Sequence, residues 1–572
     1  MRLWLGKHFQ THPLLAPVIL LGTIITVYYP AVQSGIHPVD DPGIIAHYTK
    51  LLTLSQVLLP TNSYYYRPLV EFSFWLDNLL WGMEPSVMHL ENILLHYANS
   101  LLVFVLACKV TRQESESVPL IPLVAALWFA LFPTNVEAVT WIAGRTDPLL
   151  ALFALSAVFF WLRWLETPRW QDMAATFTLF GAALLSKETA LVLSVVLALL
   201  AIASPGSATI RQRSVAIGIL AGPVLLLVLY ALFFHNGSSG LSRFLSSTNL
   251  HPGQALWDAL IALGFYAKKL FVPFPLNYAI YEVHPLYGLA GVILLPLAWW
   301  EVCRHRLAGL FFVSAALVIL PAVLVAVKQV AWTLFAERYL YLPTAFFVLG
   351  VSVAIRGYCD KHRNILLPVA LCLLVFFAGT SYQRAKLWSD KLAFFQDAVA
   401  KSPGFGSVHY SLGGLLFQNG KIQQAADAFA TADHLNKRDS MRYPIKAAIM
   451  RTKLAQGDFN GARSYFFCLF GKKEDAPDFF LELLHKTDAR RIGQMAGREK
   501  ALLANDLLGT LQLLNQKKPD PFWLYRSGQI SLMAGDKLKA AHFFRRAYAT
   551  APADAHYRDA AKTSLTRLEQ AQ

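Results

Sequence analysis

Hydrophobic and polar residues divide the chain into two regions of different kind. From Leu14 to Tyr382 one apolar run follows another, and after Gln383 the sequence becomes polar, charged and rich in alanine. A helix that crosses a bilayer core needs about 20 apolar residues. We therefore predict a membrane domain over residues 1–382 and a soluble domain over residues 383–572.

The apolar runs predict a bundle of about eleven membrane-spanning helices. The third and fifth runs are short, so tilt or partial burial in protein is expected there. The first run follows Arg2 and Lys7 and precedes no small-residue cleavage site, so we interpret it as an uncleaved signal anchor. The predicted spans are residues 14–30, 87–108, 119–133, 147–165, 172–186, 188–204, 214–234, 286–302, 308–327, 341–356 and 364–382.

Basic residues in the short loops predict the orientation of the spans, because cytoplasmic loops are rich in lysine and arginine. They predict an N-terminus inside, acidic loops outside and, with an odd number of spans, a C-terminal domain on the outer face. The inner loops hold Arg2 and Lys7, Lys109 and Arg112, Arg163 and Arg169, Arg211 and Arg213, Arg304 and Arg306, and Arg356, Lys361 and Arg363.

The soluble domain shows the pattern of tetratricopeptide repeats. In this pattern small residues let two helices approach closely, and a phenylalanine fills the space between repeats. A degenerate copy is predicted from Tyr443 to Phe466, and residues 474–520 are helical in composition but off-consensus. We expect a concave surface that binds a protein or peptide, with a structural cap on the membrane domain as the alternative. The clearest copies place Leu412, Gly413, Ala425, Phe429 and Ala432 in the first, and Ser527, Gly528, Ala540, Phe544, Ala547 and Pro552 in the last.

Charged residues within a membrane domain suggest a functional site, because charge is costly to bury in lipid. Four clusters are predicted at the outer ends of spans, and an arginine of the first outer loop joins them. These residues are Asp40 with Asp41, Glu137 with Arg145 and Asp147, Lys187 with Glu188, Glu337 with Arg338, and Arg67.

The adjacent carboxylates Asp40 and Asp41 favour acid–base chemistry, because mutual repulsion can raise the pKa of one of them toward that of a general base. Basic groups nearby would stabilise a departing phosphate, and arginine suits phosphate recognition. Each cluster also has a structural alternative, as a solvated loop or as an ion pair at a helix start. The candidate phosphate ligands are Arg67, Lys187, Lys328 and Arg338.

Composition narrows the classes of function. Only 15% of the 572 residues are charged, against roughly 25% in soluble domains. The net charge of +15 lies largely in loops where topology places it, and no basic patch with stacking aromatics predicts a nucleic-acid partner. The five cysteines have no metal spacing, and His89 and His96 on one apolar helix favour a structural role over a metal site.

The order of several motifs resembles the transmembrane-and-tetratricopeptide-repeat O-mannosyltransferases, a family of the multispanning GT-C glycosyltransferase class. The likeness begins at Asp40–Asp41 and extends over nearly the whole chain. It departs from the family pattern at Asp147, where glutamate is expected, and in having fewer clear repeats. The segments that carry it read SYYYRPLVEFSFWLDNLLWGMEPSVMHLENILLHYANSLLVF, LFPTNVEAVTWIAGRTDPLLALFALS, LLSKETALVL, FAERYLYLPTAF and YQRAKLWSDKLAFFQDAVAKSPGFGSVHYSLGGLLFQNGK.

The resemblance implies a GT-C fold, a polyprenyl-phosphate sugar donor and an active site on the outer face. It implies that Asp40 or Asp41 is the catalytic base, with Asp41 slightly favoured. Transfer of a sugar, mannose being one candidate, to a hydroxyl of a secreted protein or glycan is expected, with inversion. We expect transfer without an obligatory metal, and the two carboxylates leave a divalent cation open as the alternative.

Two other functions remain open on the sequence. One is a membrane scaffold that recruits partners through its repeats, and the other is a transporter, against which the charges cluster at one face rather than at mid-membrane. A bacterial inner membrane with a periplasmic C-terminal domain is the expected location. The glycosylation sequence Asn236-Gly237-Ser238 keeps the endoplasmic reticulum as the alternative.

Overall fold

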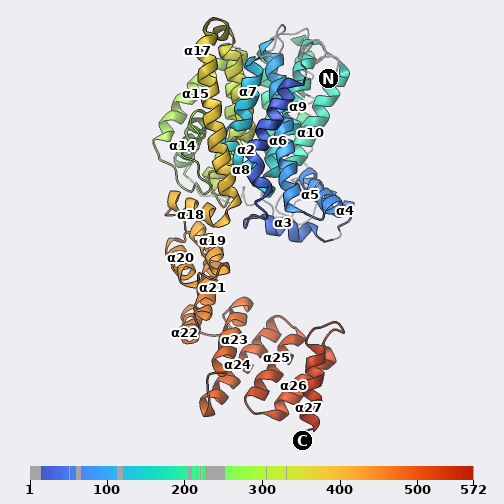
Figure 1. The fold of residues 1–572 in the computed structure, drawn as a ribbon, viewed down its shortest axis with the longest axis vertical. Helices are drawn as coiled ribbons and strands as arrows, with labels where there is room; N and C mark the ends of the chain where they lie inside the picture. Colours follow the sequence, from blue (N-terminus) through green and yellow to red (C-terminus); the bar gives the residue numbers. More distant parts are fainter. Residues whose placement is uncertain are drawn as a thin grey trace. The chain divides into compact units, whose positions relative to one another are not determined.

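Figure 1 shows a computed structural model in which the chain forms two compact units, Met1–Ser402 and Pro403–Gln572. The described residues of both units are helical and include no strand, which confirms the predicted all-α fold. The sequence analysis placed the boundary after Tyr382, whereas the first unit extends to Ser402. The structure describes residues 14–50, 52–59, 66–112, 120–203, 251–304, 306–329 and 331–570, with 209–210, 212–214, 217–218, 221–222 and 225.

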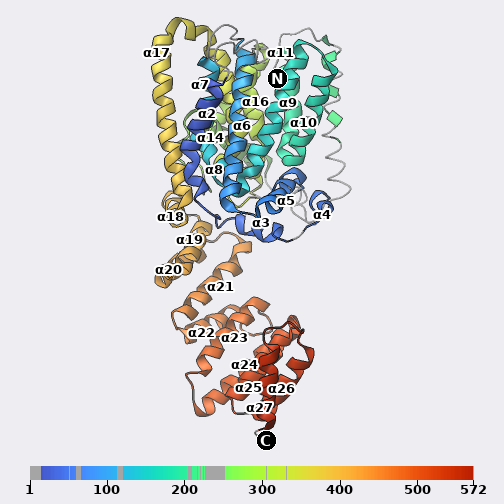
Figure 2. The same ribbon diagram turned by 45° about the vertical axis from the view of Figure 1, so that its right-hand side comes forward.

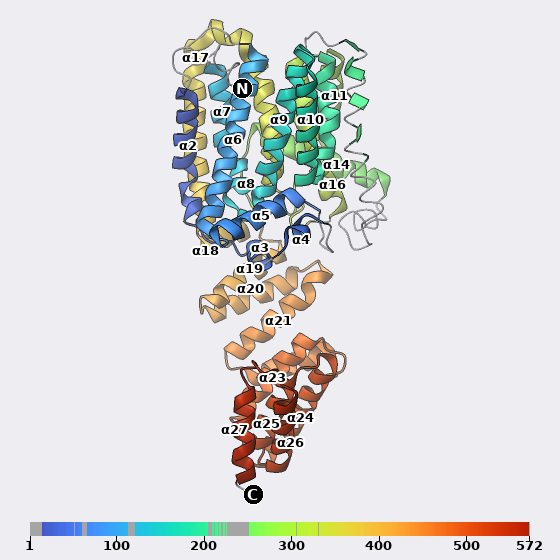
Figure 3. The same cartoon turned by 90° about the vertical axis from the view of Figure 1, so that its right-hand side faces the viewer.

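The first unit is a bundle of long apolar helices joined by short helical turns. Helices α2, α6, α7 and α9 run side by side, with α10 and α17 beside them (Figures 1 and 3). The elements are α2 (Leu15–Val32), α3 (Asp41–Tyr48), α4 (Leu54–Leu58), α5 (Pro68–Trp81), α6 (Pro85–Thr111), α7 (Leu120–Leu131), η1 (Pro133–Asn135), α8 (Val136–Thr140), η2 (Ile142–Arg145), α9 (Thr146–Glu166), α10 (Trp170–Ser186), η3 (Glu188–Val192), α11 (Leu193–Ala203), α14 (Pro252–Phe271), α15 (Tyr287–Arg304), α16 (Leu307–Lys328), η4 (Glu337–Leu340), α17 (Tyr341–Ser389) and α18 (Lys391–Lys401).

Six helices of the described residues are long and apolar enough to cross a membrane, or seven if the bent pair that α7 forms with the turns after it is one span. The chain is therefore an integral membrane protein. Helices α10, α11 and α15 occupy three further predicted spans but are shorter or less apolar. The predicted span at residues 214–234 lies largely outside the described residues, as do Asn236-Gly237-Ser238, Arg2, Lys7 and Arg211.

Helix α14 was missed by the sequence analysis. Its apolar residues are interrupted by Asp258, Lys268 and Lys269, so they do not form the continuous run that identifies a span. The helix packs closely on α15 because both carry a glycine at the crossing. A methyl group on Gly264 would lie 2.0 Å from a backbone oxygen of α15, and one on Gly291 would lie 2.2 Å from a backbone oxygen of α14.

Helix α17 holds the last two predicted spans. It breaks at His362, whose backbone leaves the helical region, and there the chain turns back on itself. Figures 2 and 3 show this turn at the end of the bundle opposite to α3 and α5. Arg356 and Arg363 therefore lie at one end of the first unit, and Asp40 and Asp41 lie at the other.

The second unit is a series of antiparallel helices. Gly413 faces the ring of Phe429 on the next helix, and Gly528 faces Phe544 in the same way, as the repeat pattern predicts. Between these pairs a core that includes Phe466 joins the off-consensus helices. The helices are α19 (Gly406–Gln418), α20 (Ile422–Leu435), α21 (Asp439–Ala455), α22 (Phe459–Phe470), α23 (Asp478–Ile492), α24 (Gly497–Lys517), α25 (Pro521–Met533), α26 (Lys537–Thr550) and α27 (Arg558–Gln570).

Candidate functional site

Asp41 is a fully buried carboxylate that joins two separate segments of the first unit. One oxygen accepts a hydrogen bond from the amide of His37 at 2.9 Å, and the other accepts from the amide of Ala143 in η2 at 3.1 Å. Burial raises the pKa of Asp41 to about 7, although these two amides act in the opposite direction. Both oxygens are thus engaged by backbone groups.

Asp40 is exposed and occupies a strained backbone conformation. Its φ of 62° and ψ of −40° lie in a region that residues other than glycine rarely adopt. The amide of Asp41 donates to the carbonyl oxygen of Val39 at 2.8 Å, so Asp40 is the central residue of a γ-turn of the rarer, strained kind. Desolvation raises the pKa of Asp40, and the nearby Arg338 guanidinium opposes that change. Strain of this kind often marks a functional residue.

Arg145 is buried at the centre of an ion-pair network. It pairs with Asp77 at 2.6 Å and with Glu91 at 2.9 Å, and its Nε donates to Asn92 at 3.0 Å. Its guanidinium also lies 4.7 Å from the centre of the Phe74 ring. These contacts tie α5, α6 and η2 together, and Arg145 does not reach the surface of the site.

Two further ion pairs lie at the start of η3. Lys187 is buried and pairs with Asp147 at 2.6 Å. Glu188 forms two bonds with Arg67, at 2.6 and 2.9 Å, and this pair is partly exposed. These contacts bring the start of α5, η3 and the start of α9 to one place.

Glu137 and Arg338 form an ion pair between α8 and η4. Glu137 is buried, and its Oε2 also accepts hydrogen bonds from the amides of Glu337 and Arg338 at 3.1 and 3.3 Å. The first amides of a helix have no partner within the helix. The carboxylate of α8 therefore caps η4, a segment 200 residues further along the chain.

Aromatic rings connect these clusters. The Arg338 guanidinium lies 5.1 Å from the centre of the Trp141 ring, and the Trp141 indole donates to the carbonyl of Val39 at 3.1 Å. Arg338 and the Lys187 ammonium both lie over the ring of Tyr339, at 5.0 and 5.4 Å from its centre. The exposed Asp40, the partly exposed Arg338 and the Arg67 pair therefore lie near the buried Lys187, and we call this region the Asp40 surface.

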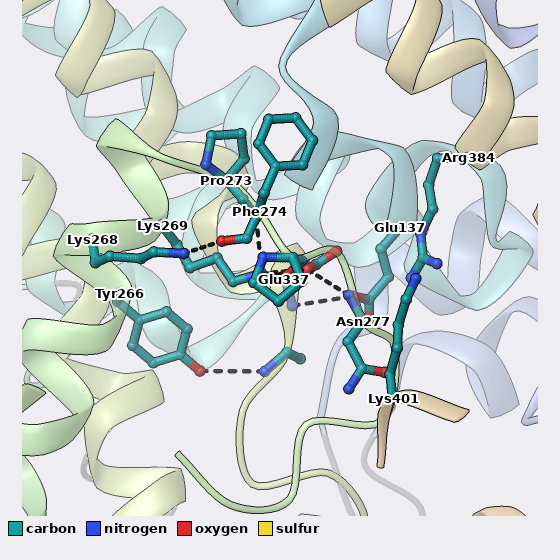
Figure 4. Close-up of polar contacts among 12 residues, drawn as sticks. Glu137, Tyr266, Lys268, Lys269, Pro273, Phe274, Asn277, Glu337, Arg384 and Lys401 are labelled. Carbon is teal, nitrogen blue, oxygen red and sulfur yellow. Dashed lines mark hydrogen bonds and ion pairs between the residues drawn. The ribbon is translucent and has the colours of Figure 1, made fainter. Parts of the chain in front are cut away.

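Glu337 belongs to a buried network that the sequence did not predict (Figure 4). It pairs with Lys269 of α14 at 2.7 Å, and the same oxygen accepts from the amide of Asn277 at 2.9 Å. Lys269 also donates to the carbonyl of Pro273 at 2.9 Å. The sequence could not predict this ion pair, because Glu337 lies 68 residues from Lys269. The one available signal was the charged Lys269 within the apolar pattern of α14.

The remaining candidates are Lys328 and the two histidines of α6. Lys328 is the last residue of α16. His96 contacts the hydroxyl of Tyr341 at 2.7 Å and a carbonyl at 3.0 Å, and His89 lies 2.8 Å from the hydroxyl of Ser34. In the part of the chain that the structure describes, no three histidine, cysteine, aspartate or glutamate side chains gather as a metal site.

The fold and the site define a helical membrane protein whose charged groups meet at one end of its bundle. Residues 67–233 match the sequence model of a family described as dolichyl-phosphate-mannose-protein mannosyltransferase. This matched segment contains Arg67, Glu137, Arg145, Asp147, Lys187 and Glu188.

Curated relatives extend the likeness along the chain. A protein O-mannosyl-transferase of Caenorhabditis elegans is 25% identical over 393 residues, which cover 65% of this chain and 54% of that protein. Protein O-mannosyl-transferase TMTC1 of Homo sapiens is 24% identical over 432 residues, covering 65% of this chain and 48% of its own. Human TMTC3 is 34% identical over 126 residues, 22% of this chain and 13% of that protein.

These matches confirm the resemblance that the motifs predicted, to the transmembrane-and-tetratricopeptide-repeat O-mannosyltransferases of the GT-C class. The chain spans about half the length of the Caenorhabditis elegans protein and of human TMTC1.

Proposed function

We propose that this protein is a membrane glycosyltransferase that takes a sugar from a polyprenyl-phosphate carrier and transfers it to a hydroxyl of an acceptor protein or glycan. Mannose is the first sugar to test, because the relatives are named O-mannosyl-transferases. The single observation that carries the proposal is the exposed carboxylate of Asp40, held in a strained turn beside Arg338.

Asp40 acts as the general base in this proposal. It takes the proton of the acceptor hydroxyl while that oxygen attacks the anomeric carbon of the donor. The bond between the anomeric carbon and the phosphate oxygen breaks, and attack from the opposite side inverts the configuration. Asp41 positions Asp40, because both of its own oxygens are occupied by backbone amides.

The cations of the same surface bind the departing phosphate. Arg67 and Arg338 each keep part of the guanidinium exposed, with side-chain exposures of 18% and 17%, while Lys187 is more deeply buried. Negative charge grows on the phosphate as the bond breaks, and preorganised cations stabilise it more than they stabilise the bound donor. The lipid chain of the donor lies among the spans, and the second unit holds the acceptor.

A transfer assay tests the proposal. The purified full chain in detergent receives radiolabelled polyprenyl-phosphate mannose and a membrane extract as the source of acceptor. Label should move to polymer with the wild type and not with the Asp40→Asn/Asp41→Asn double variant. The matched control is Asp475→Asn, which changes an exposed aspartate of the second unit and should retain activity.

A negative result in this assay would bear on the alternative function, a membrane scaffold. If the wild type transfers no label, the same assay is repeated with other lipid-linked sugars. Failure across that panel, with a folded protein, would favour a scaffold that recruits partners through the second unit. Activity in the double variant equal to that of the wild type would contradict the proposed base.

A further inference from the structure

His37 lies in a cage of aromatic rings next to the Asp40 turn. The residue is only 5% exposed. The ring centre of Phe394 is 4.8 Å away, that of Trp388 is 5.0 Å away, and that of Phe395 is 5.8 Å away. The rings of Trp141 and Tyr278 complete the cage at 6.5 and 6.2 Å.

Two of these rings belong to α18, a helix fastened at both of its ends. At its start Asp390 accepts hydrogen bonds from the first amides of the helix. Along its length Asp397 pairs with Arg384 of α17 at 3.1 Å. Just after its end Ser402 donates to the carbonyl of Ala279 at 2.6 Å and accepts from Asn277 at 2.8 Å. Asn277 in turn belongs to the Glu337 network that Figure 4 shows.

His37 is also bonded directly to the strained turn. Its Nδ1 accepts a hydrogen bond from the amide of Val39 at 3.4 Å, and its own amide donates to Asp41 at 2.9 Å. An Nδ1 that accepts must carry no proton. Burial lowers the pKa of His37 to about 3, so the ring is neutral and its proton is on Nε2. Among the described residues Nε2 has no hydrogen-bond partner.

We propose that α18 acts as a clamp on the Asp40 turn, and that His37 is the positioning residue through which it acts. The rings of Phe394 and Phe395 fix the imidazole, and the imidazole fixes Val39, the residue before Asp40. A strained residue persists only where its surroundings over-determine its conformation. This inference rests on the proposed role of Asp40 as the base.

Two measurements on the full chain in detergent test the clamp. The first is hydrogen exchange of the segment 37–41 by mass spectrometry, which requires no substrate. The second is transfer of mannose from polyprenyl-phosphate mannose, with kcat and the donor KM determined separately. The variants are His37→Phe, which keeps a ring and removes the acceptor, His37→Asn, which keeps an acceptor and removes the ring, and Phe394→Leu, which loosens the cage.

His37→Phe and Phe394→Leu should each speed exchange of the segment by about threefold to tenfold, the equivalent of one weak hydrogen bond. Both should lower kcat by a similar factor and leave the donor KM unchanged, because the phosphate ligands are not touched. His37→Asn should recover most of the kcat that His37→Phe loses. The matched control is His47→Phe, which changes an exposed histidine of the neighbouring helix α3 and should alter neither quantity.

Unchanged exchange of the segment 37–41 in both His37→Phe and Phe394→Leu would overturn the clamp. A donor KM that rises together with a fall in kcat would also overturn it, because the effect would then not be confined to the base. Faster exchange combined with full activity in Asp40→Asn would contradict the proposed base while the clamp stands, so the two failures can be told apart.

Discussion

Carboxylates cap helical turns in both units, but over very different distances along the chain. In the second unit Asp458, Asp520 and Asp536 each accept from an amide two or three residues ahead. In the first unit Asp390 is a local cap of the same kind, but Asp41 and Glu137 accept from amides 102 and 200 residues away. A local cap secures one helix, whereas a remote cap fixes one segment against another.

The pKa values of a local cap and of a remote cap are also shifted in opposite directions. Asp536 is a half-exposed local cap, and the Lys539 amide lowers the pKa of its carboxyl. Asp41 is a buried remote cap, and desolvation raises its pKa. Burying charged groups and straining the backbone at Asp40 thus both cost free energy of folding at one end of the first unit. Strained residues and buried charges of this kind cluster at functional sites, where they hold side chains in a fixed geometry.

The largest effect should come from the one exposed member of the aspartate pair. Asp40→Asn should lower kcat of sugar transfer by roughly 10²–10⁴-fold, the range of a general base, because the amide cannot take a proton. Thermal unfolding should change little, since the Asp40 side chain caps no helix. Asp41→Asn should instead lower the unfolding temperature, because its amide nitrogen would face a backbone amide.

The assay is the transfer reaction, and the unfolding curve is measured on the same preparations. A reversal of the two results, with Asp41→Asn stable and inactive and Asp40→Asn active, would assign the base to Asp41.

The next largest effect is on the free energy of unfolding, which should fall more when a remote cap is removed than when a local cap is removed. Glu137→Ala leaves Arg338 without its partner and frees two amides, and the loss of one member of a buried ion pair costs about 3–5 kcal/mol. Asp536→Ala removes only a local cap, at about 1 kcal/mol. Chemical unfolding of each unit, followed by proteolysis of its own segments, measures both. Equal losses would contradict the distinction between the two kinds of cap.

Asp41 should also give stability the opposite dependence on pH from Asp536. Between its ordinary pKa of 3.8 and its folded pKa of about 7, the native state holds a proton that the unfolded state has released. Stability from this group therefore falls as the pH rises across that window, by at most about 1.4 kcal/mol per unit. For Asp536, whose pKa is lowered, the contribution is present at neutral pH and is lost as the pH falls.

Unfolding temperatures from pH 4.5 to pH 8 should therefore decline less steeply in Asp41→Asn than in the wild type. Asp536→Asn is the control, and its curve should run parallel to that of the wild type over this range, because the ordinary and the folded pKa of Asp536 both lie below pH 4.5. An equal decline in Asp41→Asn and in the wild type would show that the buried carboxylate is ionised across this whole range.

The difference between local and remote contacts also explains which features could be predicted from the sequence. Apolar runs and the positions of Gly413 and Phe429 depend on neighbours in the chain, so the helical bundle and the packing of the second unit could be predicted. The pairing of Lys269 with Glu337 depends on a fold that brings distant segments together. Sequence could identify Asp40 and Asp41 as a pair, but not that one is buried between two amides and the other exposed in a strained turn.

The smallest effect should come from two adjacent glycines of α19, and it tests whether packing in the second unit is as local as its caps. A methyl group on Gly413 would lie 2.7 Å from the ring of Phe429, so Gly413→Ala should cost about 1–3 kcal/mol through overpacking. Gly414 has nothing within 4 Å, and Gly414→Ala should instead stabilise the helix by about 0.5–1 kcal/mol. Unfolding of the full chain, read from cleavage sites in the second unit, distinguishes the two signs. Because the proposed base and phosphate ligands all belong to the first unit, transfer to a small hydroxyl acceptor should be unchanged in both variants. A loss of that activity in Gly413→Ala would mean that the packing of the second unit affects the site.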